Sequence, residues 1–183
     1  MLIAKRLASA KKDFLAATVR IPRSSEQLDE VRALMNSFIA LHKDWYPEDA
    51  LLIDAYFDAR AFEEELESLP GEYVPPRGQL LLATFDGVAA GYVALREIDS
   101  ASCEMKRMFV YPRFPGKGVG RALGESIVQQ GKSLSYRTMR LNTSIRQDEA
   151  KALYERLDFK KIPPYCELPE ALRDWLVFME LEL

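Results

Sequence analysis

The stretch Phe114–Leu123, which reads FPGKGVGRAL, decides the fold of this chain. Its three alternating glycines, Gly116, Gly118 and Gly120, follow a strand-like segment and lead directly into a helical pattern. Glycine lets the backbone turn tightly and approach a ligand, and the first N–H groups of a helix have no partner within the helix. This junction therefore predicts a binding site for an anionic, phosphate-bearing ligand.

Two common phosphate-binding motifs fit the chain less well. A P-loop ends in Gly-Lys-Ser or Gly-Lys-Thr, which residues 131–133 supply, but Ser126 stands where that motif needs its first glycine. A dinucleotide fingerprint needs Gly-x-Gly-x-x-Gly, and the glycine that follows Gly118 and Gly120 is Gly124, one place late. The glycine loop therefore needs a different explanation.

The rest of the pattern predicts helices and strands in a definite order. In the first half we expect a strand at 18–21, a helix that begins at 24–26 and is interrupted at 45–47, a second helix from about 51 to 66, and strands at 79–85 and 88–98. The dipeptide Asp86-Gly87 between these two strands is a strong hairpin signal. In the second half we expect strands at 103–110, 138–143, 160–166 and 177–183, and helices at 117–132 and 147–157.

An antiparallel series of strands that is followed by alternating helices and strands predicts an α/β (α+β) fold. We expect a mixed, mostly antiparallel central sheet of about seven strands, flanked by helices. One domain would span residues 17–183, after an N-terminal arm or short helix over 1–16. With 183 residues, of which 48% are apolar, the chain can bury a core of its own.

Charge and hydropathy argue against two classes of partner. The net charge of −3 does not favour a nucleic-acid binder, which needs a basic surface to neutralise phosphates. No apolar run approaches the ~18 residues of a transmembrane helix. The basic segment 1–12 lacks the continuous apolar stretch of a signal peptide. We therefore expect a cytoplasmic protein that binds neither nucleic acid nor membrane.

The cysteines and the histidine give no sign of a metal or a disulfide. Cys103 and Cys166 are expected to be two buried thiols, as is usual in a cytosolic chain. His42 is the one histidine, and it lies on an amphipathic helix without a cysteine cluster nearby. No metal site is predicted, because a protein metal site needs several such ligands.

Several segments around the glycine loop resemble one family in both content and order. They are 103–112 (CEMKRMFVYP), the loop itself, 139–143 (MRLNT), 152–159 (ALYERLDF), 162–165 (IPPY) and 178–181 (FMEL). Over roughly 80 residues, this series is a more specific signal than any single glycine motif. By these segments the chain resembles the GNAT family of N-acetyltransferases, which use acetyl-coenzyme A.

The resemblance implies a GNAT-like fold in which the strand before the loop and the strand with Asn142 separate, so that the pantetheine arm enters between them. The residues that it places at acetyl-CoA are Met108, Val110, Gly116, Lys117, Gly118, Val119, Gly120, Arg121 and Asn142. A backbone N–H near Val110 would meet the oxyanion. A strand-end cap is an equal alternative for Asn142.

One position of the loop departs from the family. Pro115 stands where the family usually has glutamine or arginine, and proline has neither a cationic head nor a backbone N–H. Arg113, Lys117 and Arg121 are the candidates to supply that charge. The glycines and the helix start are retained.

The catalytic residues are also assigned by resemblance. Tyr154 matches the tyrosine whose hydroxyl lies close to the coenzyme sulfur, which makes it the candidate acid for the departing thiolate. Glu104 lies where the histone-acetylating branch of the family has its catalytic glutamate, which makes it the candidate base. The alternatives are that Glu104 pairs with Lys106, Arg107 or Arg140, and that a water chain removes the proton.

The acceptor is the least defined part. In related enzymes the first two helices contribute to its site, which suggests Trp45 and Tyr46, with Asp44, as a lid over the substrate. The cluster Glu63–Glu67 is expected to be a solvated helix face. We expect acetyl transfer to the primary amine of a small molecule, such as an amino acid, a polyamine or an aminoglycoside-like compound. The alternatives are a protein lysine or N-terminus, and a non-catalytic acyl-CoA-binding module; a homodimer is common among relatives.

Overall fold

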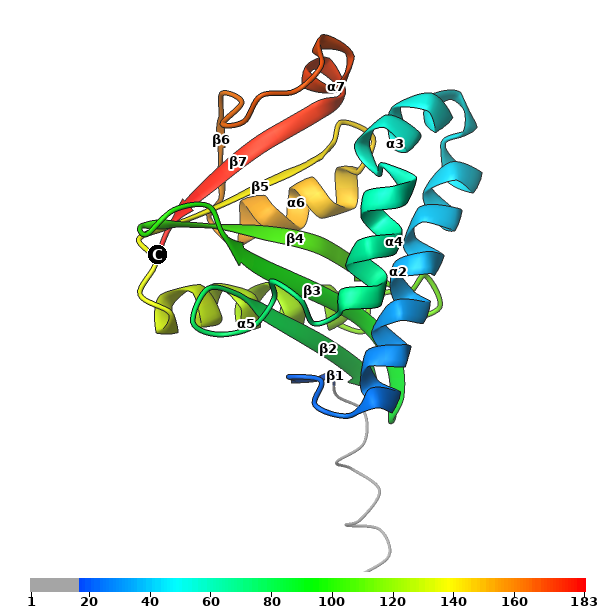
Figure 1. Cartoon of the computed structure of the whole chain (residues 1–183), viewed down its shortest axis with the longest axis vertical. Coiled ribbons are helices and arrows are strands. Elements are labelled where there is room, and N and C mark those ends of the chain that lie inside the picture. The colour runs from blue at the N-terminus through cyan, green and yellow to red at the C-terminus, as the bar shows by residue number, and fades with distance from the viewer. Residues whose placement is uncertain (1–16) are drawn as a thin grey trace, which may run out of the picture.

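The computed structural model describes residues 17–183, which form a single sheet with helices on both faces (Figure 1). The seven strands are β1 (Ala17–Arg20), β2 (Gln79–Phe85), β3 (Val88–Glu97), β4 (Ser102–Val110), β5 (Thr138–Ser144), β6 (Lys160–Ile162) and β7 (Leu176–Glu182), in the spatial order β1-β2-β3-β4-β5-β7-β6. All neighbours pair antiparallel except β4 and β5, which run parallel. The predicted mixed, mostly antiparallel sheet is confirmed. The arm expected over 1–16 lies outside the described residues.

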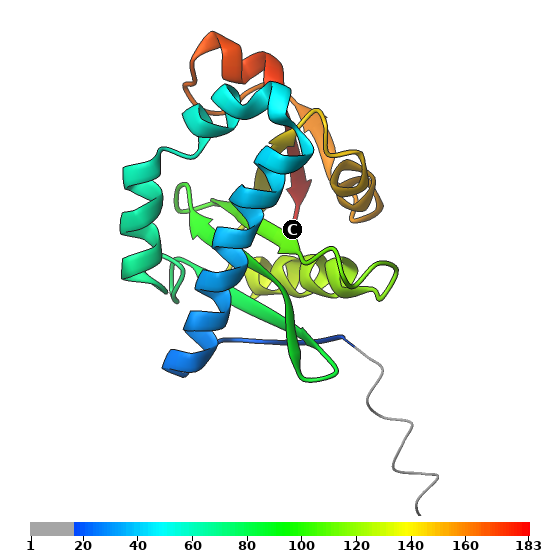
Figure 2. The same ribbon diagram turned by 90° about the vertical axis from the view of Figure 1, so that its right-hand side faces the viewer.

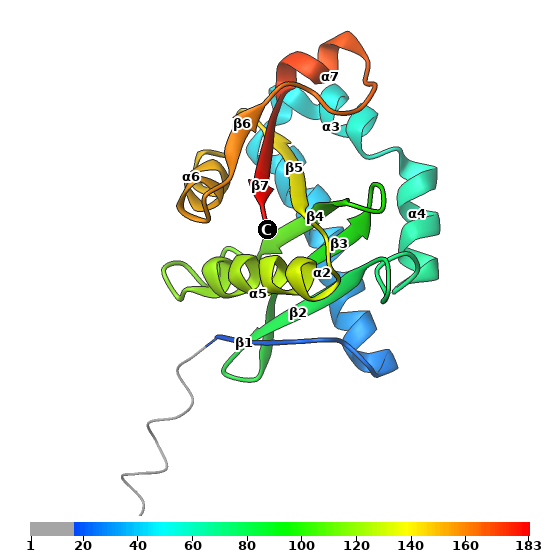
Figure 3. The same cartoon turned by 90° about the vertical axis from the view of Figure 1, so that its left-hand side faces the viewer.

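The helices fall into two groups, one on each face of the sheet (Figures 2 and 3). The first comprises α2 (Ser25–Trp45), the 3-10 turn η1 (Pro47–Asp49), α3 (Ala50–Tyr56) and α4 (Ala59–Ser68); the second comprises α5 (Val119–Ser133) and α6 (Asp148–Arg156), and the short α7 (Glu170–Trp175) precedes β7. Within residues 17–183, no helix is long and apolar enough to cross a membrane.

Two apolar cores lie on the two faces of the sheet, and β2 contributes to both. Leu80 and Leu82 belong to the core under α2, whereas Leu81 and Ala83 belong to the core under α5. Because side chains alternate along a strand, a strand that is covered on both sides reads as a continuous apolar run. Every residue of β2 is buried accordingly.

The start of α2 and its buried face place the far end of this helix at the candidate site. The Ser24 side chain accepts a hydrogen bond from the Gln27 N–H, and the Gln27 side chain accepts one from the Ser24 N–H, which is a capping box. Buried positions such as Leu34, Phe38 and His42 recur at helical spacing along one side. The helix thereby presents Phe38 and His42 to the gap between β4 and β5.

The single helix predicted from about 51 to 66 is wrong, because the chain breaks it at Phe57. Helix α3 ends there, and Asp58 begins α4 by accepting a hydrogen bond from the Ala61 N–H at 2.8 Å. Phe57 is buried against Phe38, with ring centroids 5.6 Å apart. The break turns Tyr56 and Phe57 toward the candidate site.

Three other predictions about the second half need correction. The helix after the loop begins at Val119 rather than Lys117, since Gly118 has a left-handed φ of 73°. Strand β6 ends at Ile162, because two prolines follow that have no N–H to donate to the sheet. Cys166 therefore lies on a loop and is exposed rather than buried. Helix α7 was not predicted.

Candidate active site

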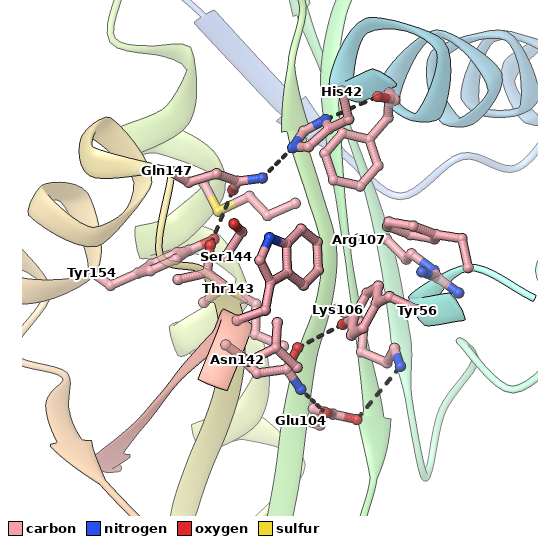
Figure 4. A pocket seen from close by; sticks show the side chains of 16 residues that line it. His42, Tyr56, Glu104, Lys106, Arg107, Asn142, Thr143, Ser144, Gln147 and Tyr154 are labelled. Carbon is pink, nitrogen blue, oxygen red and sulfur yellow. Dashed lines mark hydrogen bonds and ion pairs between the residues drawn. The ribbon is translucent and has the colours of Figure 1, made fainter. Parts of the chain in front are cut away.

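A pocket forms where β4 and β5 separate (Figure 4). The two strands pair at only three positions, the last of which joins Glu104 to Arg140. Strand β4 then continues to Val110 and β5 to Ser144 without further pairing. The walls of the pocket come from α2, the α3–α4 junction, β4, β5, α6 and the α7–β7 junction.

Glu104 lies at the closed end of this split and is 4% exposed. One carboxylate oxygen accepts hydrogen bonds from the Tyr165 hydroxyl at 2.7 Å and from the Asn142 amide at 3.4 Å. The other oxygen forms an ion pair with the guanidinium of Arg96 at 2.8 Å, and Lys106 Nζ is 3.9 Å away. Of the three partners considered from the sequence, only Lys106 approaches the carboxylate, because Arg107 pairs with Glu65 and Arg140 with Glu180. The main partner, Arg96, was not among them.

A hydrogen bond bridges the split above this cluster. The Tyr56 hydroxyl on α3 donates to Asn142 Oδ1 on β5 at 2.6 Å. Burial raises the pKa of Tyr56 to about 12, so its hydroxyl stays protonated near neutral pH. The bridge holds the α3–α4 junction against the far side of the split.

A bulge in β4 provides another wall of the pocket. Strand β4 has one more residue than β3 at this point, around Arg107 and Met108, and Arg107 has a left-handed φ of 57°. The Arg107 guanidinium donates to both carboxylate oxygens of Glu65 on α4, at 2.6 to 3.2 Å, and lies over the Phe57 ring. Glu65 therefore anchors α4 to the sheet, unlike the solvated face that was expected for its cluster.

His42 occupies the opposite end of the pocket from Glu104. Its Nδ1–H donates to the Phe38 carbonyl at 2.9 Å, which leaves Nε2 to accept a hydrogen bond from the Gln147 side-chain amide. The Gln147 carbonyl oxygen in turn accepts from the Thr143 hydroxyl. Burial lowers the pKa of His42 and so favours this neutral form.

Tyr154, the predicted acid, lines the same pocket as Glu104, from α6 (Figure 4). Among the described residues its hydroxyl has no hydrogen-bond partner, although the side chain packs against Phe159 with ring centroids 6.0 Å apart. Burial raises the pKa of Tyr154, so this hydroxyl is protonated at neutral pH and free to donate.

The glycine loop follows the C-terminal end of β4, the end away from Glu104, and it carries the anion-binding features. Gly116 and Gly118 both have left-handed φ angles, 66° and 73°, and a side-chain carbon at either position would meet no neighbouring atom. Helix α5 begins directly after Gly118 without a side-chain cap. The first N–H groups of α5, at Val119 and Gly120, are therefore available to an anion.

The cations near the loop are held in different ways. Lys117 Nζ lies 5.6 Å from the centre of the Phe85 ring, and Arg113 lies over the Tyr111 ring. Arg121 forms an ion pair with Glu125, which is one turn further along α5. No described contact decides which of them compensates for Pro115, so that assignment stays a prediction.

Val110, at the end of β4, points its N–H toward the split. The next residue, Tyr111, donates its N–H to the Ala90 carbonyl of the neighbouring segment at 2.8 Å. Successive N–H groups of a strand point to opposite edges, so the N–H of Val110 faces away from β3. That is the side from which β5 has separated.

The predicted lid residues lie outside the pocket walls. Trp45 is 47% exposed at the end of α2, and the Tyr46 hydroxyl donates to the Arg146 carbonyl at 3.3 Å. Neither lines the pocket, which Tyr56 and Phe57 cover instead. A substrate contact by Trp45 and Tyr46 stays a prediction.

Sequence reasoning missed four residues at the site: Tyr56, Arg96, His42 and Gln147. The one signal available in the sequence was that His42, a polar residue, occupies a position of the apolar face of its helix. The structure shows that this position is buried. Within the described part of the chain, no group of His, Cys, Asp and Glu side chains is arranged to hold a metal ion.

The comparisons with known proteins agree with this geometry. The model of the acetyltransferase (GNAT) family matches residues 35–159. An uncharacterised N-acetyltransferase of Schizosaccharomyces pombe is 34% identical over 123 residues, which are 66% of this chain and 74% of that protein. The human N-acetylaspartate synthetase is 32% identical over 111 residues, which are 60% of this chain and 36% of that protein.

Solved structures share the same fold. One of them is the PaiA N-acetyltransferase of Thermoplasma acidophilum in complex with coenzyme A, with a TM-score of 0.66 and 16% identity. The match covers 92% of this chain and 99% of that one. The likeness therefore extends over nearly all of both chains.

Proposed function

Since the chain belongs to the acetyltransferase (GNAT) family, it is an N-acetyltransferase that uses acetyl-CoA, and we propose that its acceptor is the primary amine of a small molecule. The observation that carries this proposal is the bridge from Tyr56 to Asn142 across the split. A peptide needs a groove that is open at both ends. Here the bridge covers one side, and the Glu104 cluster closes the end.

The residues around the loop and the split fit acetyl-CoA. The left-handed glycines Gly116 and Gly118 leave room in front of α5, whose first N–H groups suit a pyrophosphate. The separation of β4 from β5 beyond Glu104 leaves the N–H of Val110 free for a carbonyl oxygen or the pantetheine arm. Met108, in the pocket wall, would contact the same arm.

Acetyl-CoA supplies a thioester carbonyl, to which the acceptor nitrogen bonds directly while the bond from carbon to sulfur breaks. The N–H of Val110 would stabilise the negative charge that develops on the thioester oxygen. Tyr154 would donate a proton or a hydrogen bond to the leaving sulfur, because its hydroxyl is protonated and has no other described partner.

The contacts of Glu104 favour a positioning role over that of the base. Its carboxylate already accepts hydrogen bonds from Tyr165 and Asn142, and it forms an ion pair with Arg96. We propose that Glu104 fixes these groups and that water in the split removes the proton from the acceptor amine. A Glu104→Gln variant would then keep the pH dependence of the rate. If Glu104 were the base, the same variant would lose the acidic limb of the pH–rate profile.

The test of this function has two steps. Calorimetric titration should show binding of acetyl-CoA and no binding of ATP. Thiol release should then be measured with small primary amines and with short peptides that carry a free lysine or N-terminus. Faster turnover of the small amines supports the proposal, and faster turnover of the peptides would replace it with protein acetylation. Binding without turnover of either class would indicate a non-catalytic acyl-CoA module.

The human N-acetylaspartate synthetase is named for a small acetylated product, which agrees with a small acceptor. The chain spans about a third of that protein, so the agreement concerns the acetyltransferase segment alone.

A further inference from the structure

The charges around the acceptor side of the pocket do not balance. Arg107 is matched by Glu65 through three hydrogen bonds, and Arg96 is matched by Glu104. Lys106 also lines the pocket, and its closest anion is the same Glu104 carboxylate, at 3.9 Å. Three cations therefore share two carboxylates, which leaves one positive charge in excess.

A third carboxylate, that of Glu72, does not remove this excess. It lies 3.4 Å from the guanidinium of Arg96, Glu72 does not line the pocket, and its side chain is 53% exposed. An exposed pair of this kind is screened by solvent and contributes little. His42, at the far end of the pocket, is held neutral by burial. Three further polar side chains at this end of the pocket, Tyr56, Asn142 and Tyr165, carry no charge.

Lys106 is buried without full compensation. Its side chain is only 16% exposed, and its Nζ donates no hydrogen bond within the part of the chain that the structure describes. An ammonium group in such surroundings loses hydration and is costly unless it gains an anionic partner. The Asn142 amide also has donor capacity in reserve, because its contacts to Glu104 and Tyr165 are both long, at 3.4 Å.

We propose that the acceptor is a primary amine that carries a carboxylate, such as an amino acid, and that Lys106 binds this carboxylate at the closed end of the split. The inference rests on the proposed function. It excludes polyamines and aminoglycoside-like compounds as preferred acceptors, because Lys106 would repel a second cation. Figure 4 shows Lys106, Asn142, Tyr56 and Glu104 meeting at this end of the pocket.

The test compares amino acids with their carboxamides, which keep the amine and the shape but lose the negative charge. We expect kcat/KM to be at least about 10-fold higher for the acids, in line with a buried charged hydrogen bond. Lys106→Met should raise KM for the acids by about 10- to 100-fold with little change in kcat, and should leave the carboxamides unaffected. Lys106→Arg keeps the charge and should restore part of the preference.

Two controls separate binding from folding and from chemistry. Lys151→Met removes a lysine of similar exposure that pairs with Asp148 outside the pocket, and it should behave as wild type. Calorimetric binding of the acids and carboxamides to the protein with coenzyme A gives a readout that does not need turnover. A fall in kcat with unchanged KM in Lys106→Met would overturn the proposal and assign Lys106 to the chemistry.

The outcomes distinguish this inference from the proposed function. If carboxamides or polyamines bind and react as well as the acids do, the proposed carboxylate site at Lys106 is wrong. The proposed function, acetyl transfer to small amines, is then still supported. If neither acids nor other small amines bind or react but peptides do, the proposed function fails as well.

Discussion

The two sides of the β4–β5 split are built from different parts of the chain. The cofactor side consists of backbone, with Gly116 and Gly118 in left-handed conformations and the free N-terminus of α5. The acceptor side consists of side chains that meet from distant segments, such as Tyr56 on α3 and Asn142 on β5. Variants of the first side should change cofactor affinity and leave acceptor choice as it is, whereas variants of the second should change stability and acceptor choice together.

The largest effect is expected where the two sides meet, at Tyr154. Tyr154→Phe removes the hydroxyl that would donate to the leaving sulfur, so kcat should fall by about 100-fold. Binding of acetyl-CoA should be unchanged, because the loop and α5 are not altered. Steady-state thiol release and calorimetric titration measure the two quantities.

Tyr92→Phe is the matched control for this variant. Tyr92 is fully buried, and its hydroxyl has no hydrogen-bond partner among the described residues. Its loss should leave turnover at the wild-type value. Full turnover in Tyr154→Phe would show that the sulfur needs no donor from α6.

The next effect isolates the cofactor side. Gly118→Val places a side chain in front of α5 and strains a φ of 73°, so the Kd for acetyl-CoA should rise by about 30-fold. Gly87→Val is the control, since Gly87 has a φ of 77° in the β2–β3 hairpin and also has open space around it. Both variants should lose about 1–2 kcal/mol of stability through the same strain. Equal affinities for acetyl-CoA would contradict the assignment of the loop.

This contrast also explains how much could be predicted from the sequence. The glycine loop is defined by local conformation: Gly116 and Gly118 adopt angles that other residues avoid, and the helix follows within a few positions. The alternation in β2 and the helical spacing in α2 are equally local. Such features leave a pattern in neighbouring residues, and for that reason the mixed sheet and the order of its strands along the chain were predicted.

The acceptor side left no such pattern. The pairs that form it are separated by 42 residues for Arg107 and Glu65, and by 86 for Tyr56 and Asn142. The sequence neighbours of each of these side chains also suggest a common role for it. Glu65, for example, was interpreted as a solvent-exposed residue of an acidic helix segment. Only the break at Phe57 had a nearby cause, because Asp58 is a preferred N-cap residue.

The third prediction tests whether the acceptor side also supports the fold. Glu104→Ala leaves Arg96 and Lys106 without their shared buried anion. Because Arg96 is partly exposed, we expect a loss of about 2 kcal/mol rather than the larger cost of breaking a fully buried pair. In a chain of this size, thermal unfolding should shift downward by about 4–8 °C. Glu125→Ala removes an exposed partner of Arg121 and should shift the midpoint by far less.

The smallest effect concerns the far end of the pocket, where His42 is the one imidazole of the chain. Burial lowers the pKa of His42, so the unfolded state binds its proton at a higher pH than the folded state does. The contribution of His42 to the free energy of unfolding is therefore fully present above about pH 6.5, and it is lost as the pH decreases through the lowered pKa. One proton limits the slope to about 1.4 kcal/mol per pH unit. In His42→Gln, the free energy of unfolding from denaturant titrations at pH 5.5 to 7.5 should lose this dependence. A slope that persisted in the variant would come from a group other than His42 and would contradict this assignment.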